Sequence, residues 1–182
     1  MTNATDELAA HAALLREAFD RTFAEAPVES HRDSEDFLAL NVGGDDYAVR
    51  LNEISGLFEG KRWRALPGAA PALLGIAGFR GALVPIYDLN ALLGYAPATS
   101  PRWLVLIKTH PSVGLAFERL DGHLRVSREA LSSEADSAKA DAPVRETLRE
   151  ANAVRGVLHL PTILETIKNR ARRTSPKKGV TA

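Results

Sequence analysis

The 182-residue chain has no cysteine, which excludes disulfides, thiolate zinc sites and a cysteine nucleophile. Only 6% of its residues are aromatic, so its core must be built mainly from aliphatic side chains. Basic and acidic residues balance at 23 each, so no overall field attracts nucleic acid or an anionic membrane. No stretch approaches the ~18 consecutive apolar residues of a membrane span, and no basic segment precedes an apolar run at the N-terminus. We therefore expect a cytoplasmic protein.

Residues 1–35 predict an amphipathic helix followed by a polar linker. Apolar side chains recur at three- and four-residue steps at Leu8, Ala12, Leu15, Phe19 and Phe23. Such a stripe is typical of a helix that packs on the body of the fold. The alternative interpretation is an arm that docks on a partner or pairs with itself.

From residue 36 the hydrophobic period shortens to two, which is typical of β-strands. The segments "DFLALNV" and "YAVRLNEI" flank the turn "GGDD" and predict a hairpin. Its apolar positions are Leu38, Leu40, Val42, Tyr47, Val49 and Leu51. At the tip, Asp45 and Asp46 fit a solvated turn better than a metal site or an acid–base pair.

The stretch "LLGIAGFRGALVPIYDL", residues 73–89, predicts a second hairpin with a tight turn at "GFRG". It is apolar almost throughout, yet Arg80 stands in its middle. The flanking glycines are expected to lift Arg80 out of the core, while Leu83, Val84 and Ile86 anchor the strand behind it. "NALLGY" then predicts a short helix closed by a glycine.

A second group of strands follows the linker "ATSP". The segments "RWLVLIKT", "VGLAFERL" and "VRGVLHL" predict strands, and Asp121-Gly122 is a local signal for a type I′ turn. Residues 128–152 are polar and poor in β-branched side chains, which predicts a long loop with marginal helix. Pro161 suits the first turn of a terminal helix, before a basic tail. The apolar stripe of that helix is Ile163, Leu164 and Ile167.

Many short strands without long helical crossovers favour a mainly β fold with two small β-barrels over a parallel sheet. The expected organisation is a helix and linker at 1–35, a first barrel at 36–98, a second barrel at 99–160, and a C-terminal helix with a basic tail at 161–182.

Motifs that carry catalysis or bind a metal or a cofactor are missing. The five histidines show no HxH or HExxH spacing, and there is neither a G-x-S-x-G elbow nor a Walker-type loop. The sequence therefore predicts a protein that is not an enzyme and that holds no metal or cofactor.

Two basic segments leave nucleic-acid binding open as a minor alternative. Trp63 lies among Lys61, Arg62 and Arg64, a cluster that could stack on bases. The C-terminal cations are Lys168, Arg170, Arg172, Arg173, Lys177 and Lys178. The neutral overall charge and the aliphatic strands argue against this function and favour a protein that binds proteins.

The segments "FLALNVGGDDYAVRLNEISGL" and "LPGAAPALLGIAGFRGALVPIYDLNALLG" closely resemble the CheW family of chemotaxis coupling proteins. The matching positions are Phe37, Leu38, Asp46, Tyr47, Pro67, Gly75, Arg80, Gly81, Pro85, Asp88 and Leu89. The likeness covers about residues 36–167 and is looser in the second half.

The resemblance implies two five-stranded SH3-like barrels and a non-enzymatic adaptor. Such proteins couple methyl-accepting chemoreceptors to a CheA-type histidine kinase. The first barrel would pair with the kinase's regulatory domain, and the groove between the barrels would hold the receptor's helical tip. Ile54, Gly75 and Arg80 match positions that the family uses in this groove. The plain alternatives are a strand residue, a turn glycine and a surface arginine.

Several departures from the family pattern favour a divergent member. Gly78 replaces an asparagine before the Leu-Arg-Gly motif, and Gly56 replaces a frequent glutamate. Glu118-Arg119 stands where the family has Asp-Gly, and "REANAVRG" replaces a glycine-rich approach to the last strand. The resemblance also places Asp121-Gly122 inside a continuing strand or a bend. Such a protein would bind only one of the two partners, or would serve surface motility.

Overall fold

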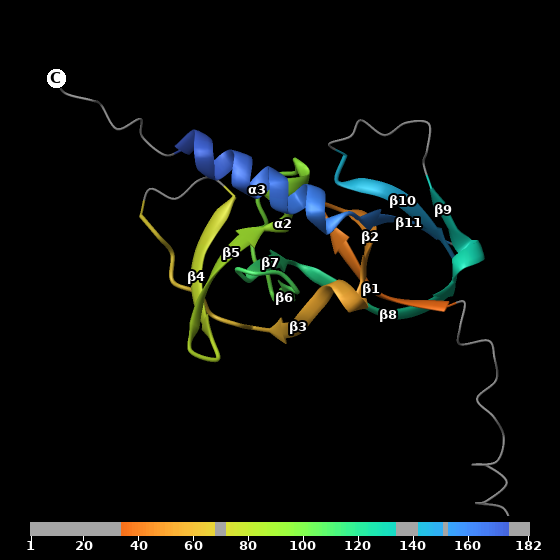
Figure 1. Cartoon of the computed structure of the whole chain (residues 1–182), viewed down its shortest axis with the longest axis horizontal. Coiled ribbons are helices and arrows are strands. Elements are labelled where there is room, and N and C mark those ends of the chain that lie inside the picture. Colours follow the sequence, from red (N-terminus) through yellow and green to blue (C-terminus); the bar gives the residue numbers. More distant parts are fainter. Residues whose placement is uncertain (1–33, 68–71, 134–141, 151–152, 175–182) are drawn as a thin grey trace, which may run out of the picture. The chain divides into compact units, whose positions relative to one another are not determined.

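The structure, a computed structural model, describes residues 34–67, 72–133, 142–150 and 153–174. The predicted N-terminal helix and the tail after residue 174 lie outside these ranges. The described residues form a mainly β protein with eleven strands in two sheets and two α-helices (Figure 1). The expectation of a mainly β fold is therefore confirmed.

The first sheet has six strands in the order β8-β1-β2-β11-β10-β9. Its bounds are β1 Ser34–Val42, β2 Asp45–Arg50, β8 Arg119–Ser127, β9 Leu131–Ser133, β10 Val144–Arg149 and β11 Val154–Leu158. The β1–β2 hairpin is antiparallel, with Phe37 opposite Arg50, as its alternating pattern predicts. The last strand of the described residues, β11, pairs with β2 in parallel.

The second sheet has five strands in the order β3-β6-β7-β5-β4. Its bounds are β3 Ile54–Glu59, β4 Leu73–Phe79, β5 Ala82–Asp88, β6 Trp103–Ile107 and β7 Val113–Phe117. Each sheet thus takes strands from both segments 36–98 and 99–160. This differs from the expected organisation, in which each segment forms a barrel from its own strands. The physical reason is that the buried strands β6 and β7 pair with β3 and β5 rather than with later strands.

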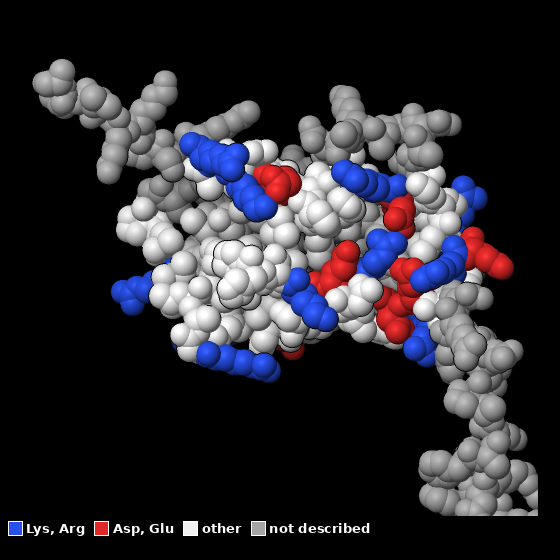
Figure 2. All heavy atoms as spheres, viewed as in Figure 1, with Lys and Arg blue, Asp and Glu red and all other residues white. Residues whose placement is uncertain are grey.

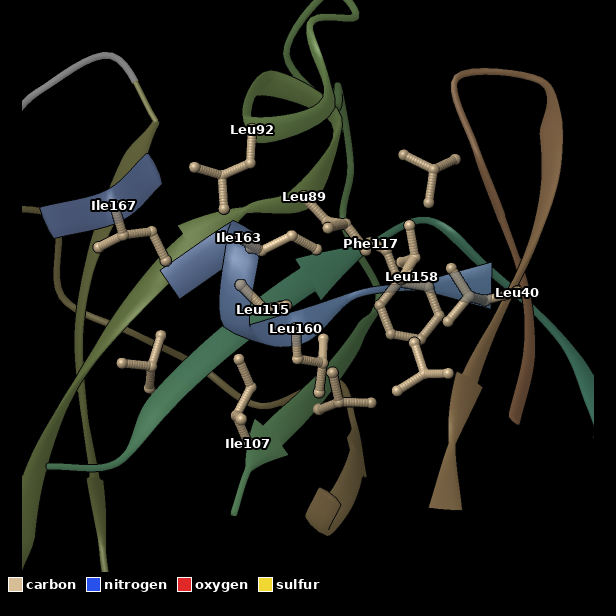
Figure 3. Close-up of a cluster of buried hydrophobic side chains, with 14 of the residues drawn as sticks. Leu40, Leu89, Leu92, Ile107, Leu115, Phe117, Leu158, Leu160, Ile163 and Ile167 are labelled. Atoms are coloured by element: carbon tan, nitrogen blue, oxygen red, sulfur yellow. The ribbon is translucent and has the colours of Figure 1, made fainter. Parts of the chain in front are cut away.

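A shared hydrophobic core joins the two sheets and both helices (Figure 3). Its fully buried members include Leu40 from the first sheet, Leu115 and Phe117 from the second, and Leu158 at the end of β11. Helix α3, Leu160–Thr174, covers this core with the predicted stripe, of which Ile163 and Ile167 are buried. Each large side chain that is fully buried contributes about 1.5–3 kcal/mol.

The short helix α2, Leu89–Leu93, also forms as predicted. The Asp88 side chain caps its first turn by accepting from the backbone N–H groups of Asn90 and Ala91. Gly94 ends it in the left-handed conformation, with φ of +95°. Asp88 is fully buried and also accepts from the N–H of Ala98, which ties the following linker to the helix.

Three local predictions in the second half and in β5 are wrong. Residues 128–152 contain strands β9 and β10, because Leu148 is buried and β10 pairs with β9 and β11. Asp121 and Gly122 lie inside strand β8, as the family resemblance implied, because β8 continues alongside β1. Leu83 is 74% exposed and does not anchor β5, whereas Val84 and Ile86 are buried.

Two details of the first hairpin also differ from the prediction. Strand β2 stops at Arg50, and Leu51 begins the 3-10 turn η2, Leu51–Glu53, where it is exposed. Asp45 is not only solvated, because it accepts a short hydrogen bond from the Tyr95 hydroxyl. The Tyr95 hydroxyl also bonds that of Tyr47.

Candidate functional site

The β4–β5 hairpin presents Arg80 to solvent on a two-residue turn. Arg80 and Gly81 both have positive φ, +47° and +83°, as the central residues of a type I′ turn do. Among the described residues, Arg80 makes no ion pair and no side-chain hydrogen bond. A side chain other than glycine or asparagine costs about 1 kcal/mol in this backbone conformation. Arg80 therefore occupies the turn even though its backbone conformation there favours glycine or asparagine.

Gly75 is buried and acts through its backbone. Its φ of +153° disfavours other residues, and an added Cβ would lie 2.1 Å from the carbonyl oxygen of Arg64. Arg64 and Ile76 exchange two backbone hydrogen bonds of 2.8 and 2.9 Å at this point. The glycine thus lets the segment that contains Arg64 lie directly against β4, and its side-chain position offers no surface to a partner.

Ile54 begins β3 directly after η2 and is half-buried against the shared core. The ladder between β3 and β6 shifts register between Ile54 and Gly56. Leu51 and Leu57, on either side of Ile54 in sequence, are 38% and 36% exposed. The η2–β3 segment therefore carries several aliphatic side chains that are open to solvent in part.

The three candidate residues occupy separate positions of the five-stranded sheet, with Arg80 at the turn after β4. Ile54 lies on β3 and Gly75 on β4, which are the two end strands of the five-stranded sheet. Gly75 and Arg80 are five residues apart, roughly 16 Å along an extended chain. The end strands do meet elsewhere, since the rings of Phe58 and Phe79 lie 5.0 Å apart. The candidate site is therefore an extended surface.

The remaining motif positions support the hairpin and its exit. Gly81 completes the turn, and Asp88 is the buried cap of α2 described above. Pro85 lies half-buried in β5, opposite Ile76 of β4. The residue types of Gly81 and Asp88 follow from backbone geometry and capping.

A pocket that the sequence analysis missed opens between η2, the end of β6, β10 and the start of α3. It has a volume of about 830 Å³, and its walls include Glu53, Ile107, Lys108, Arg145, His159 and Leu164. These residues come from segments far apart in the sequence, so no local sequence pattern could have predicted the pocket. The pocket adjoins Ile54 through its neighbour Glu53.

One carboxylate oxygen in this pocket lacks a hydrogen bond. Glu53 Oε2 is buried and has no partner among the described residues. Burial raises the pKa of Glu53, against the opposing charge of Arg50. The backbone of Glu53 is fixed, because its carbonyl accepts from the N–H of Lys108 at 2.7 Å.

A hydrogen-bonded chain fixes the state of the pocket's histidine. Arg145 donates to the Thr162 hydroxyl at 3.2 Å, and this hydroxyl lies 2.8 Å from His159 Nδ1. The Thr162 backbone N–H also donates to Nδ1, which therefore acts as the acceptor. Burial, and then the charge of Arg145, lower the pKa of His159. Both effects disfavour the protonated imidazole at the N-terminus of α3.

Two kinds of functional feature are absent from the part of the chain that the structure describes. No three acidic or histidine side chains there lie close enough to hold a metal ion. Across the same residues, no helix is long and apolar enough to cross a membrane. A two-sheet fold with an exposed hairpin tip, a partly apolar strand and an open pocket is typical of a binding module.

Comparison with known proteins places this module in a family. Residues 36–168 match the family model described as the CheW-like domain, and the chain therefore belongs to the CheW family. A curated relative, the chemotaxis protein CheW of Bacillus subtilis, is 18% identical over 136 residues, which span 72% of this chain and 87% of the relative.

Two further comparisons agree with this assignment. A probable chemotaxis protein CheW of Rhizobium etli is 27% identical over 99 residues, or 53% of this chain and 64% of that protein. The crystal structure of the scaffolding protein TtCheW from Thermoanaerobacter tengcongensis superposes with a TM-score of 0.65 at 12% identity, covering 72% of this chain and 92% of that one. The low identities mark a divergent member, as the departures at Gly56 and Gly78 indicate.

Proposed function

We propose that this protein is a non-enzymatic adaptor that couples methyl-accepting chemoreceptors to a CheA-type histidine kinase, in chemotaxis or surface motility. The observation that carries the proposal is the CheW-like domain, which spans residues 36–168. A relative named as a chemotaxis protein and a solved structure named as a scaffolding protein support it. The cytoplasmic location at receptor arrays belongs to the same proposal.

In this proposal each sheet closes into a small SH3-like barrel, and the receptor's helical tip lies between the two. The contact between Phe58 and Phe79 and the isolated bridge between Arg64 and Ile76 support closure of the five-stranded sheet, because they join its end strands or the segments beside them. The half-exposed aliphatic side chains around Ile54 offer the apolar contacts, and Arg80 offers a charged one.

A narrower version of the function, with only one partner, draws support from two glycines. A Cβ at Gly56 would lie 2.7 Å from the Phe58 ring, so a glutamate there requires this ring to move. A Cβ at Gly78 would meet nothing within 4 Å, so the lost asparagine leaves open space beside the turn. Compared with the family pattern, both positions lack a side chain that could make a polar contact.

Separate binding measurements with the cognate kinase's regulatory domain and with a receptor signalling fragment test the proposal. Binding of both partners supports coupling, and binding of one supports the narrower version. If calorimetry detects neither complex, the proposal fails. Arg80→Ala should weaken binding of the receptor fragment about tenfold, as loss of an exposed charged contact to a partner does. Unchanged affinity would remove Arg80 from the receptor site.

A further inference from the structure

Four cations around the β4–β5 hairpin lack an acidic partner in the described part of the chain. Lys61, Arg62 and Arg64 lie on the segment that follows β3, and Arg80 lies at the hairpin turn. Six described arginines elsewhere bind a carboxylate, namely Arg50, Arg102, Arg119, Arg125, Arg128 and Arg155. We call these four cations, together with Leu83, the hairpin patch.

Strand register brings Arg62, Arg64 and Leu83 of the hairpin patch to one face, beside Arg80 at the turn. The bridge between Arg64 and Ile76 is antiparallel, and the same register carried two residues further places Arg62 beside Gly78. The position of Lys61 agrees, because its Nζ lies 4.6 Å from the centre of the Phe79 ring. On the other side, Gly78 pairs with Leu83 of β5.

Gly78 therefore leaves a bare stretch of backbone between a cation and an aliphatic side chain. Neighbouring strands lie about 4.8 Å apart, and directly opposed residues of antiparallel strands point to the same face. Arg62, Gly78 and Leu83 are all exposed, which puts them on the outer face. With no side chain at Gly78, Leu83 is 74% exposed, the largest value among the exposed large hydrophobic residues.

The aromatic side chains of this region are not available for stacking on bases. Trp63 packs against the small core cluster of the five-stranded sheet. Phe79 packs on Phe58 and is covered by Lys61. Single-stranded nucleic acids bind through exposed aromatic platforms as well as through cations, whereas an exposed leucine among arginines suits a protein partner.

We propose that the hairpin patch docks an acidic segment of a partner protein, whose carboxylates pair with Arg62, Arg64 and Arg80 and whose aliphatic side chain packs over Gly78 against Leu83. This inference rests on the proposed function only for which protein carries the acidic segment in the cell. Its chemistry follows from unpaired positive charge next to exposed aliphatic surface.

The test uses the full chain labelled with ¹⁵N and a synthetic amphipathic helical peptide that carries leucine on one face and glutamate elsewhere. Amide shifts are expected at residues 61–64 and 78–83. The double variant Arg62→Gln/Arg64→Gln should weaken binding of the peptide about tenfold or more, and Leu83→Ser should weaken it severalfold. Arg128→Gln removes an exposed cation of the 3-10 turn Arg128–Ala130, which lies between β8 and β9 and outside the hairpin patch, and it serves as the control, with unchanged affinity expected.

Three results would overturn the inference: shifts that map elsewhere, equal binding of a peptide with lysine in place of glutamate, or tighter binding of a single-stranded oligonucleotide of about 12 nucleotides to the same residues. Thermal unfolding of each variant separates lost contacts from lost structure. If the proposed function fails but this inference holds, the chain will bind neither the kinase domain nor the receptor fragment, while the peptide still binds at the hairpin patch. The two failures can therefore be distinguished.

Discussion

The six-stranded sheet and the hairpin patch of the five-stranded sheet use their charged residues in opposite ways. In the six-stranded sheet, Arg50 bridges Glu35 and Glu146, and Arg155 bridges Asp121 and Glu150, so that charge pairs connect different strands, including strands that are not direct neighbours. Over the five-stranded sheet, the cations of the hairpin patch have no such partners among the described residues. Figure 2 shows the same contrast on the face in view, where acidic side chains gather mainly over the six-stranded side.

This difference indicates which charged residues stabilise the fold and which are available to bind a partner. Paired charges that lie partly out of water hold strands in register, and their replacement costs folding free energy. Unpaired cations in water contribute little to stability and remain available to a partner. The six-stranded sheet thus supports the fold, while the five-stranded sheet offers the surface, and both depend on the one core between them.

The largest effect is expected in that shared core. Leu115→Ala removes a fully buried side chain of β7 that packs among residues from both sheets. It should lower the free energy of unfolding by about 3 kcal/mol, measured by urea titration. Amide exchange should accelerate in β2 and β5 alike. Acceleration confined to β5 would show that the sheets are stabilised separately.

The second prediction compares the two kinds of arginine directly. Arg50→Ala leaves Glu35 and Glu146 without their shared partner and uncovers the Phe37 ring, over which the guanidinium lies. It should cost about 1–2 kcal/mol of stability. Arg62→Ala should change stability by less than about 0.5 kcal/mol, since its side chain is exposed and unpaired. Equal losses in the two variants would erase the contrast between the sheets.

Sequence reasoning succeeded where one short segment decides the structure. The alternation in β1, the glycines around Arg80 and the stripe of α3 each predict an element that forms, because turns, caps and amphipathic faces are local properties. The exposure of Arg80 followed from the same local logic.

It failed where distant segments decide. Asp121-Gly122 is a good turn signal, yet pairing with β1 keeps it in a strand. Leu148 sits in a polar stretch, and only its place between β9 and β11 explains its burial. Leu83 belongs to an apolar strand, yet its side chain faces outward. The pocket at Glu53 is assembled from segments that are far apart in the sequence. Register between remote strands leaves no local trace.

The third prediction concerns the strain at the hairpin tip. Arg80→Asn places a residue that tolerates positive φ in a turn where the arginine has φ of +47°. The variant should be more stable by up to about 1 kcal/mol, with a higher midpoint of thermal unfolding. Its affinity for an acidic partner should fall. A variant that lost both stability and affinity would show that the arginine supports the turn rather than a partner.

The smallest effect is expected from His159, where α3 meets the pocket. Burial and the charge of Arg145 hold the pKa of this histidine below its unfolded value, so the unfolded chain takes up a proton first as the pH falls. Its contribution to stability is present above about pH 6.5 and is lost as the pH drops through the folded pKa. His159→Asn keeps a helix-capping side chain that cannot titrate. Urea titrations at pH 7.5 and at about pH 5 should therefore differ less for this variant than for the natural chain, and an equal difference would assign the acid sensitivity to the paired carboxylates of the six-stranded sheet.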